Sequence, residues 1–73
     1  LYDDTFRLAE MMLQTRHDLM QKAVGWMLRE VGKRDKELLC RFLDIHGRKM
    51  PRTMLRYAIE RFPADIRRYY LTK

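Results

Sequence analysis

The chain has 73 residues, of which 16 are Lys or Arg and 10 are Asp or Glu, so its net charge is +6. This length allows one small domain, and the positive charge favours polyanionic partners such as nucleic acid, although a solvated basic surface would give the same count. The only cysteine, Cys40, excludes an internal disulfide and fits a reducing compartment, and no apolar run is long enough to cross a bilayer, so we expect a cytoplasmic protein without a membrane partner.

Apolar residues recur with helical spacing along almost the whole chain, and no alternating run is typical of a strand. The first predicted helix covers residues 4–14, where Asp3 or Asp4 can accept hydrogen bonds from the first-turn amides. A short turn is expected at residues 15–17. The apolar face of this helix consists of Phe6, Ala9, Met12 and Leu13.

Two helices are predicted in the middle of the chain. The second covers residues 18–31, with Asp18 as its cap and Gly32 at the position where a helix commonly ends in a left-handed conformation. The third covers residues 35–45, begins at the cap Asp35 and stops before the next glycine. Its apolar side consists of Leu38, Leu39, Phe42, Leu43 and Ile45.

Two prolines mark the start of the last two helices. Pro51 suits the first position of a helix over residues 51–62, because its missing N–H costs nothing there. The buried stripe of this helix is predicted to be Met54, Leu55, Ala58, Ile59 and Phe62. The fifth helix covers residues 63–71, and its packing residues are Ile66, Tyr69, Tyr70 and Leu71.

Five helices with short connections predict an all-α fold of antiparallel helical pairs. The second and fourth helices begin 33 residues apart (51 − 18), a spacing typical of two-helix repeats. A small self-contained bundle is the alternative that this pattern leaves open. Because the chain begins with Leu1 rather than Met, we expect it to be a segment of a longer protein.

The predicted helix at residues 18–31 has a large aromatic residue on its polar side. With about 100° per residue, the apolar residues fall on one side of the helix. They are Met20, Ala23, Val24, Met27 and Val31, with Leu28 at the border. The opposite side has Lys22, Gly25, Trp26, Arg29 and Lys33. The Trp26 ring packs on a neighbouring helix or lines a groove together with these cations, and both hold if one edge of the ring packs while the other faces the groove.

The groove interpretation gives a candidate nucleic-acid site. Cations neutralise phosphates, and an aromatic face stacks on bases or attracts a cationic group. Gly25 would let a ligand or another backbone approach closely. The candidate DNA-binding residues are Lys22, Trp26, Arg29, Lys33, Arg52 and Arg56. Arg67 and Arg68 form a second basic cluster, for which solvation is the simpler explanation.

The sequence has no arrangement of residues that is typical of catalysis. His17 and His46 are isolated, and no Cys, His, Asp or Glu spacing resembles a metal site. No glycine-rich phosphate loop and no Ser with a partnered His occur. We therefore expect no catalytic residue, no metal and no cofactor in these residues.

Residues 21–30 resemble the signature of the DNA alkylation repair family, the HEAT-like-repeat alkylpurine DNA glycosylases. The family form is roughly Lys-Ala-hydrophobe-Gly-Trp-hydrophobe-Leu-Arg-Glu, and all its fixed positions match. Residues 35–42 resemble the next family helix, and residues 55–59 resemble the Arg-Glu-Ala segment after it, with Tyr57 in place of the usual Glu. The resemblance covers about residues 17–62.

This resemblance implies a HEAT-like α-α superhelix and the C-terminal part of a larger repeat domain, with residues 1–73 as one segment. It implies that Trp26 lines a cleft for double-stranded DNA, next to an alkylated purine, with Lys22, Arg29 and Arg56 as weaker candidates. The alternative for Arg29 and Glu30 is a structural role, in which they pair with neighbouring helices. The family's catalytic Asp lies upstream in a Trp-rich segment, so we expect the isolated chain to be inactive and open to self-association. The alternative is a non-enzymatic helical-repeat scaffold that binds nucleic acid or a protein.

Overall fold

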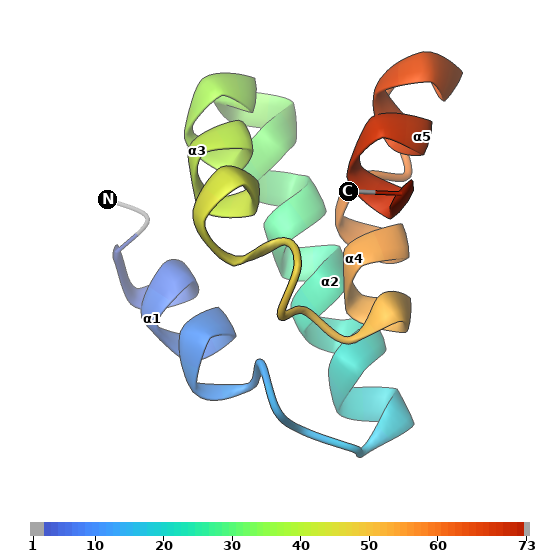
Figure 1. The fold of residues 1–73 in the computed structure, drawn as a ribbon. Helices are drawn as coiled ribbons and strands as arrows, with labels where there is room; N and C mark the ends of the chain where they lie inside the picture. The colour runs from blue at the N-terminus through green and yellow to red at the C-terminus, as the bar shows by residue number, and fades with distance from the viewer. Residues whose placement is uncertain (1–2, 73) are drawn as a thin grey trace.

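The computed structural model describes residues 3–72, and these residues form five α helices and no strand (Figure 1). The prediction of an all-α fold with five helices is confirmed. The helices are α1 (Asp3–Met11), α2 (Asp18–Arg34), α3 (Lys36–His46), α4 (Arg52–Ala58) and α5 (Ala64–Thr72). No helix in this part of the chain is both long and apolar enough to cross a membrane.

The longest helix, α2, lies at the centre and contacts α1, α3 and α4 (Figure 1). Successive helices run in opposite directions, whereas α2 and α4 run side by side in the same direction (Figure 1). The starts of α2 and α4 are 34 residues apart (52 − 18), close to the predicted spacing. Alternate helices in parallel, each paired with an antiparallel neighbour, are the arrangement that stacked helical pairs have.

Contacts between alternate helices have a constant register. On one side, Phe6 stacks on Phe42 with ring centroids 5.2 Å apart, and Glu10 contacts His46 one turn later at 3.0 Å. Both pairs are 36 residues apart in sequence (42 − 6 and 46 − 10). The second contact lies four residues further along both α1 and α3, so the two helices run in the same direction.

One apolar core joins all five helices, and it includes the whole stripe predicted for the fourth helix. Met54, Leu55, Ala58, Ile59 and Phe62 are each at most 7% exposed. The core also contains Ala9, Val24, Leu28, Leu39, Phe42, Leu43, Met50 and Tyr70. Phe6, Met12 and Leu13 pack against it, so the predicted apolar face of the first helix is confirmed.

Several predicted helix ends were wrong. The helix α1 stops at Met11, and α2 continues through Gly32 to Arg34 with no glycine of the described residues at positive φ. A Cβ at Gly32 would lie 2.4 Å from Leu39 Cδ2, so this glycine makes room for α3 rather than ending the helix.

The predicted caps had mixed outcomes. Asp35 caps α3 as predicted, because its Oδ1 accepts a hydrogen bond from the Leu38 amide at 3.2 Å. Asp18 lies inside the first turn of α2, whose cap residue is His17. Pro51 is likewise the cap residue of α4 and not its first helical residue.

Four predicted packing residues are at the surface. Ile45 is 72% exposed and Tyr69 is 55% exposed, although the Tyr69 ring contacts Tyr70 edge-on at 5.1 Å. On α2, Met20 is 40% exposed, and Ala23 is exposed too. The buried side of α2 is therefore turned toward Gly25 and Leu28, because two neighbouring helices, α3 and α4, cover that side.

Candidate nucleic-acid interface

Gly25 fixes how closely α4 approaches α2. A Cβ at this position would lie 2.6 Å from the Met54 carbonyl oxygen and 2.7 Å from Tyr57 Cβ. Such distances are shorter than van der Waals contact, so only glycine allows this packing. Of the two interpretations of Gly25, the structure selects the approach of another backbone, since α4 itself occupies the space beside it.

Trp26 remains at the surface, just beyond the contact with α4. It is 49% exposed, so a neighbouring helix does not bury the whole ring, and about half of the residue remains open to solvent. The α4 backbone meets α2 at Gly25, and one residue further on the side chain is rotated by about 100° around the helix. Trp26 therefore lies at the edge of the α2–α4 contact rather than inside it.

An open pocket of about 530 Å³ lies between α2, α4 and α5. Its basic lining residues come from three helices: Lys22 from α2, Arg56 from α4 and Arg67 from α5. Glu60 is the one acidic residue among the lining residues, which also include Thr53, Tyr57, Ile59 and Leu71. The pocket is therefore cationic, with an aromatic wall at Tyr57 and with Trp26 one helical turn from Lys22.

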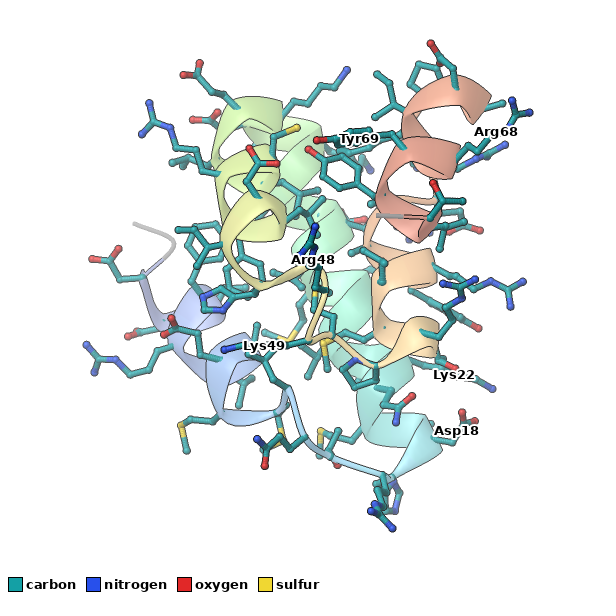
Figure 2. The ribbon with its side chains drawn as sticks, viewed as in Figure 1. Asp18, Lys22, Arg48, Lys49, Arg68 and Tyr69 are labelled. Atoms are coloured by element: carbon teal, nitrogen blue, oxygen red, sulfur yellow. The ribbon has the colours of Figure 1, made fainter. Side chains whose placement is uncertain are left out.

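Two of the predicted cations have acidic partners on their own helix. Lys22 Nζ lies 3.2 Å from Asp18 Oδ2, and Figure 2 shows both side chains at the start of α2. The hydrogen bond and the charge of Asp18 raise the pKa of Lys22 above its ordinary value, so the ammonium stays charged. Lys33 Nζ lies 3.5 Å from Glu30 Oε1. Both lysine side chains are nearly half exposed and can still contact a phosphate.

Arg29 differs from these lysines because its side chain is only 17% exposed. Its guanidinium forms an ion pair with Glu60, in the turn after α4, and lies 3.5 Å from Glu30. Arg29 also borders two smaller depressions, one with Lys33 and one with Arg61. The structure thus places Arg29 between helices, which is the structural alternative to a DNA contact that the sequence left open for it.

Arg52 is at the surface, but its Nη1 donates a hydrogen bond to the Leu71 carbonyl oxygen at 2.7 Å. This contact ties the start of α4 to the end of α5. Arg52 is not among the residues that line the pocket, in contrast to Arg56 one turn later. The structure therefore separates two arginines that the sequence grouped together.

Sequence analysis did not identify Thr53 and Tyr57 as site residues and treated Arg67 as a solvated cation. Tyr57 is 38% exposed, and its Cβ packs against Gly25. Arg67 reaches the pocket because the chain reverses at Pro63, and its Nη1 donates to the Glu60 carbonyl oxygen at 3.3 Å. Pro63, a residue type that commonly ends a helix, was the signal in the sequence that could have predicted this reversal.

The other labelled cations lie elsewhere. Arg68, like Tyr69, lies on α5, and Arg48 and Lys49 lie on the α3–α4 connection, apart from Lys22 (Figure 2).

The described part of the chain has no group of three or more His, Cys, Asp or Glu side chains that could hold a metal ion. The pocket instead combines guanidinium and ammonium donors with a phenol ring, and a half-exposed indole lies nearby. Donors of this kind bind phosphate oxygens, and aromatic faces stack on bases.

The comparisons with known proteins identify one family. A family model described as DNA alkylation repair enzyme matches residues 1–62. Searches of curated proteins and of solved structures found no match to this chain. Since the family model covers most of the sequence, including the whole α2–α4 contact, the chain belongs to the DNA alkylation repair enzyme family.

Proposed function

We propose that this chain supplies part of the DNA-binding cleft of a DNA glycosylase that excises alkylated purines. The observation that carries the proposal is the half-exposed Trp26 one helical turn from Lys22, which lines a pocket together with Arg56 and Arg67. A surface indole beside clustered cations suits a ligand that has both phosphates and an aromatic group.

The chemistry of the lesion fits this arrangement. Alkylated purines excised by such enzymes carry positive charge, and a cation is attracted to the face of an indole. Membership of the repair family supports the same role for Trp26, which matches the Trp of the family signature. The chain then binds and orients DNA, while the carboxylate that stabilises the sugar cation comes from a different segment of the enzyme.

We also propose that the helices form the C-terminal part of a HEAT-like stack. The parallel α2 and α4 and the constant register of α1 and α3 support stacked helical pairs. In such a stack each pair contacts only its neighbours, and a curved surface is available for a long ligand.

Salt dependence of DNA binding tests the electrostatic part of the proposal. The logarithm of affinity for duplex DNA should fall linearly with the logarithm of salt concentration, and Lys22→Ala or Arg56→Ala should each lower the slope by about 0.9. Arg41→Ala is the control, because Arg41 is exposed on α3 and pairs with Glu37 on its own helix. Equal slopes in all variants would contradict the role of the pocket.

Excision tests the aromatic part. In the complete enzyme, Trp26→Ala should lower the excision rate of a cationic alkylpurine by about tenfold or more, since one lost cation–π contact in a desolvated site is worth about 2 kcal/mol. The fold should survive, as far-UV circular dichroism would show. Unchanged excision would mean that Trp26 is not part of the cleft.

One observation favours the second candidate, a scaffold that binds a protein. Met11 and Leu19 are 71% and 69% exposed, and with the half-exposed Met20 they flank the α1–α2 connection. Large apolar side chains that are exposed at these helix ends are available for contacts with further protein. Size-exclusion chromatography of the chain at two concentrations tests this, since self-association through these residues would shift the elution volume and Leu19→Lys would suppress the shift.

A further inference from the structure

The contact between Arg29 and Glu60 joins the two helices that frame the candidate site. Arg29 lies on α2 and Glu60 directly follows α4, and their side chains form an ion pair. The Arg29 side chain is 17% exposed, while that of Glu60 is 58% exposed. The Nε atom of Arg29 is buried without a hydrogen-bond partner among the described residues, so most of this guanidinium is withdrawn from solvent.

The same guanidinium also contacts the indole. Arg29 Cζ lies 5.7 Å from the centroid of the Trp26 ring, three residues earlier on α2. This distance is within the range in which a cation is attracted to an aromatic face. The neighbouring residue, Gly25, contacts α4 and sets the backbone position of Trp26. The contact with Arg29 adds a side-chain constraint on the Trp26 ring, which is half exposed.

We infer that Glu60 and Arg29 are positioning residues that hold the Trp26 ring in one orientation at the edge of the DNA cleft. Glu60, in the turn after α4, holds the guanidinium of Arg29 through the ion pair. The guanidinium in turn contacts the indole of Trp26 on the same helix, α2, and restrains its orientation. Arg29 then acts through Trp26 and not as a phosphate contact. The consequence for DNA rests on the proposed function, whereas the effect on the ring does not.

The ion pair can hold the ring because it limits the number of rotamers that the long side chains of Arg29 and Glu60 adopt. A free arginine side chain loses rotamer entropy when it is fixed. The planar guanidinium has several N–H donors in one plane, so it can bind carboxylates at its edge while its face lies against a ring. Glu60 and Glu30 occupy the edge, which leaves a face available to Trp26.

Tryptophan fluorescence tests this directly, because Trp26 is the only tryptophan of the sequence. Acrylamide quenching is measured on the whole chain and on Glu60→Gln, Arg29→Lys and Glu10→Gln, well below the unfolding temperature. Glu10→Gln is the matched control. It removes a carboxylate that is 54% exposed and also joins two parallel helices, but it contacts His46 on the other side of the fold.

Glu60→Gln should raise the quenching constant by up to about twofold, since 49% of Trp26 is exposed already and release of the ring would expose the rest. Arg29→Lys should act in the same direction, because an ammonium keeps the charge of the pair but lacks the planar face. Glu10→Gln should leave quenching unchanged.

Unchanged quenching in both Glu60→Gln and Arg29→Lys would overturn the inference, whatever happens to the melting temperature, and would reduce the pair to a contact between helices. An equal rise in Glu10→Gln would overturn it too, because the rise would then report general loosening. If Glu60→Gln does not fold by circular dichroism, Arg29→Lys decides the matter.

DNA binding separates this inference from the proposed function. Arg29→Lys should weaken duplex binding without lowering the salt slope, since the positive charge is kept and no phosphate contact is lost, whereas Lys22→Ala lowers the slope. A lower slope in Arg29→Lys would overturn the positioning role and return Arg29 to the phosphate contacts. If quenching rises as expected but the chain has no salt-dependent affinity for DNA, the proposed function fails and the positioning of Trp26 stands.

Discussion

The α1–α3 contact and the α2–α4 contact join parallel helices in two different ways. Between α1 and α3, the rings of Phe6 and Phe42 stack, the His46 ring lies 4.6 Å from Phe42, and Glu10 is at the outer edge. Between α2 and α4, a glycine meets backbone, and the aromatic residue next to it is at the surface.

The difference shows what a glycine does in a helix contact. Aromatic rings between helices fill space and stabilise the fold, as on the α1–α3 side. On the α2–α4 side the helices are too close for a ring, so the neighbouring ring is left at the edge, where it is available to a ligand. One contact therefore serves stability, and the other positions a surface aromatic residue.

The largest expected effect compares the two aromatic residues. Phe42→Ala should lower the free energy of unfolding by about 3–5 kcal/mol, because Phe42 is only 6% exposed and packs in the core. Trp26→Ala should lower it by about 1 kcal/mol or less, as expected for a half-exposed residue. Urea unfolding of both variants measures these values, and similar losses would mean that Trp26 is a core residue.

A smaller effect is expected from the glycines. Gly25→Ala should destabilise the chain by up to about 2 kcal/mol, because overpacking costs about 1–3 kcal/mol and alanine returns about 1 kcal/mol of helix propensity. Gly32→Ala is the control, since the atom in its way is the end of the Leu39 side chain, which can rotate, and not backbone. Thermal unfolding should rank Gly25→Ala well below Gly32→Ala, and the reverse order would refute the close backbone contact.

The smallest effect concerns Tyr70, which joins α5 to α3 through a hydrogen bond from its hydroxyl to Asp44 Oδ1 at 3.4 Å. Burial is the main cause that raises its pKa above the ordinary 10.0, and contacts with Cys40 and Asp44 add to it. The fold therefore favours the neutral phenol, whose contribution is complete below pH 10 and is lost as the pH rises from there toward the folded pKa.

The measurement is the melting temperature from about pH 9 to about pH 11. Wild type should lose more stability over this range than Tyr70→Phe, which has no phenol to ionise. The difference between the two curves removes the effect of the lysines, because both proteins contain all of them. Parallel curves would show that ionisation of Tyr70 is not linked to folding, and the α3–α5 contact would then depend on packing alone.

Several features could be predicted because they depend on nearby residues. The Asp35 cap was predicted because a carboxylate reaches an amide three residues ahead. The core stripe of the fourth helix was predicted because helical spacing alone groups its members. The exposed cations Lys22 and Arg56 were identified by charge and spacing, and the structure brings both to one pocket.

Other features depend on contacts between distant segments. Gly32 looked like a helix end because glycine is common there, but the approach of Leu39 gave it a different role. The sequence left two roles open for Arg29, and only the position of Glu60 shows that it pairs between helices. Arg67 was predicted to be solvated, and it lines the pocket because α5 folds back. These partners are far away in sequence, and no local pattern indicates them.

The sequence by itself determined that the chain is helical, basic and marked by the Gly-Trp signature of a DNA repair family, because periodicity, charge and short motifs are local properties. Only the tertiary structure decided which side of α2 is buried and which cations remain available. The physical reason is that burial and ion pairing depend on the helices that pack against α2. The approach of α4 at Gly25 buries one side of α2 and leaves Trp26 at the surface.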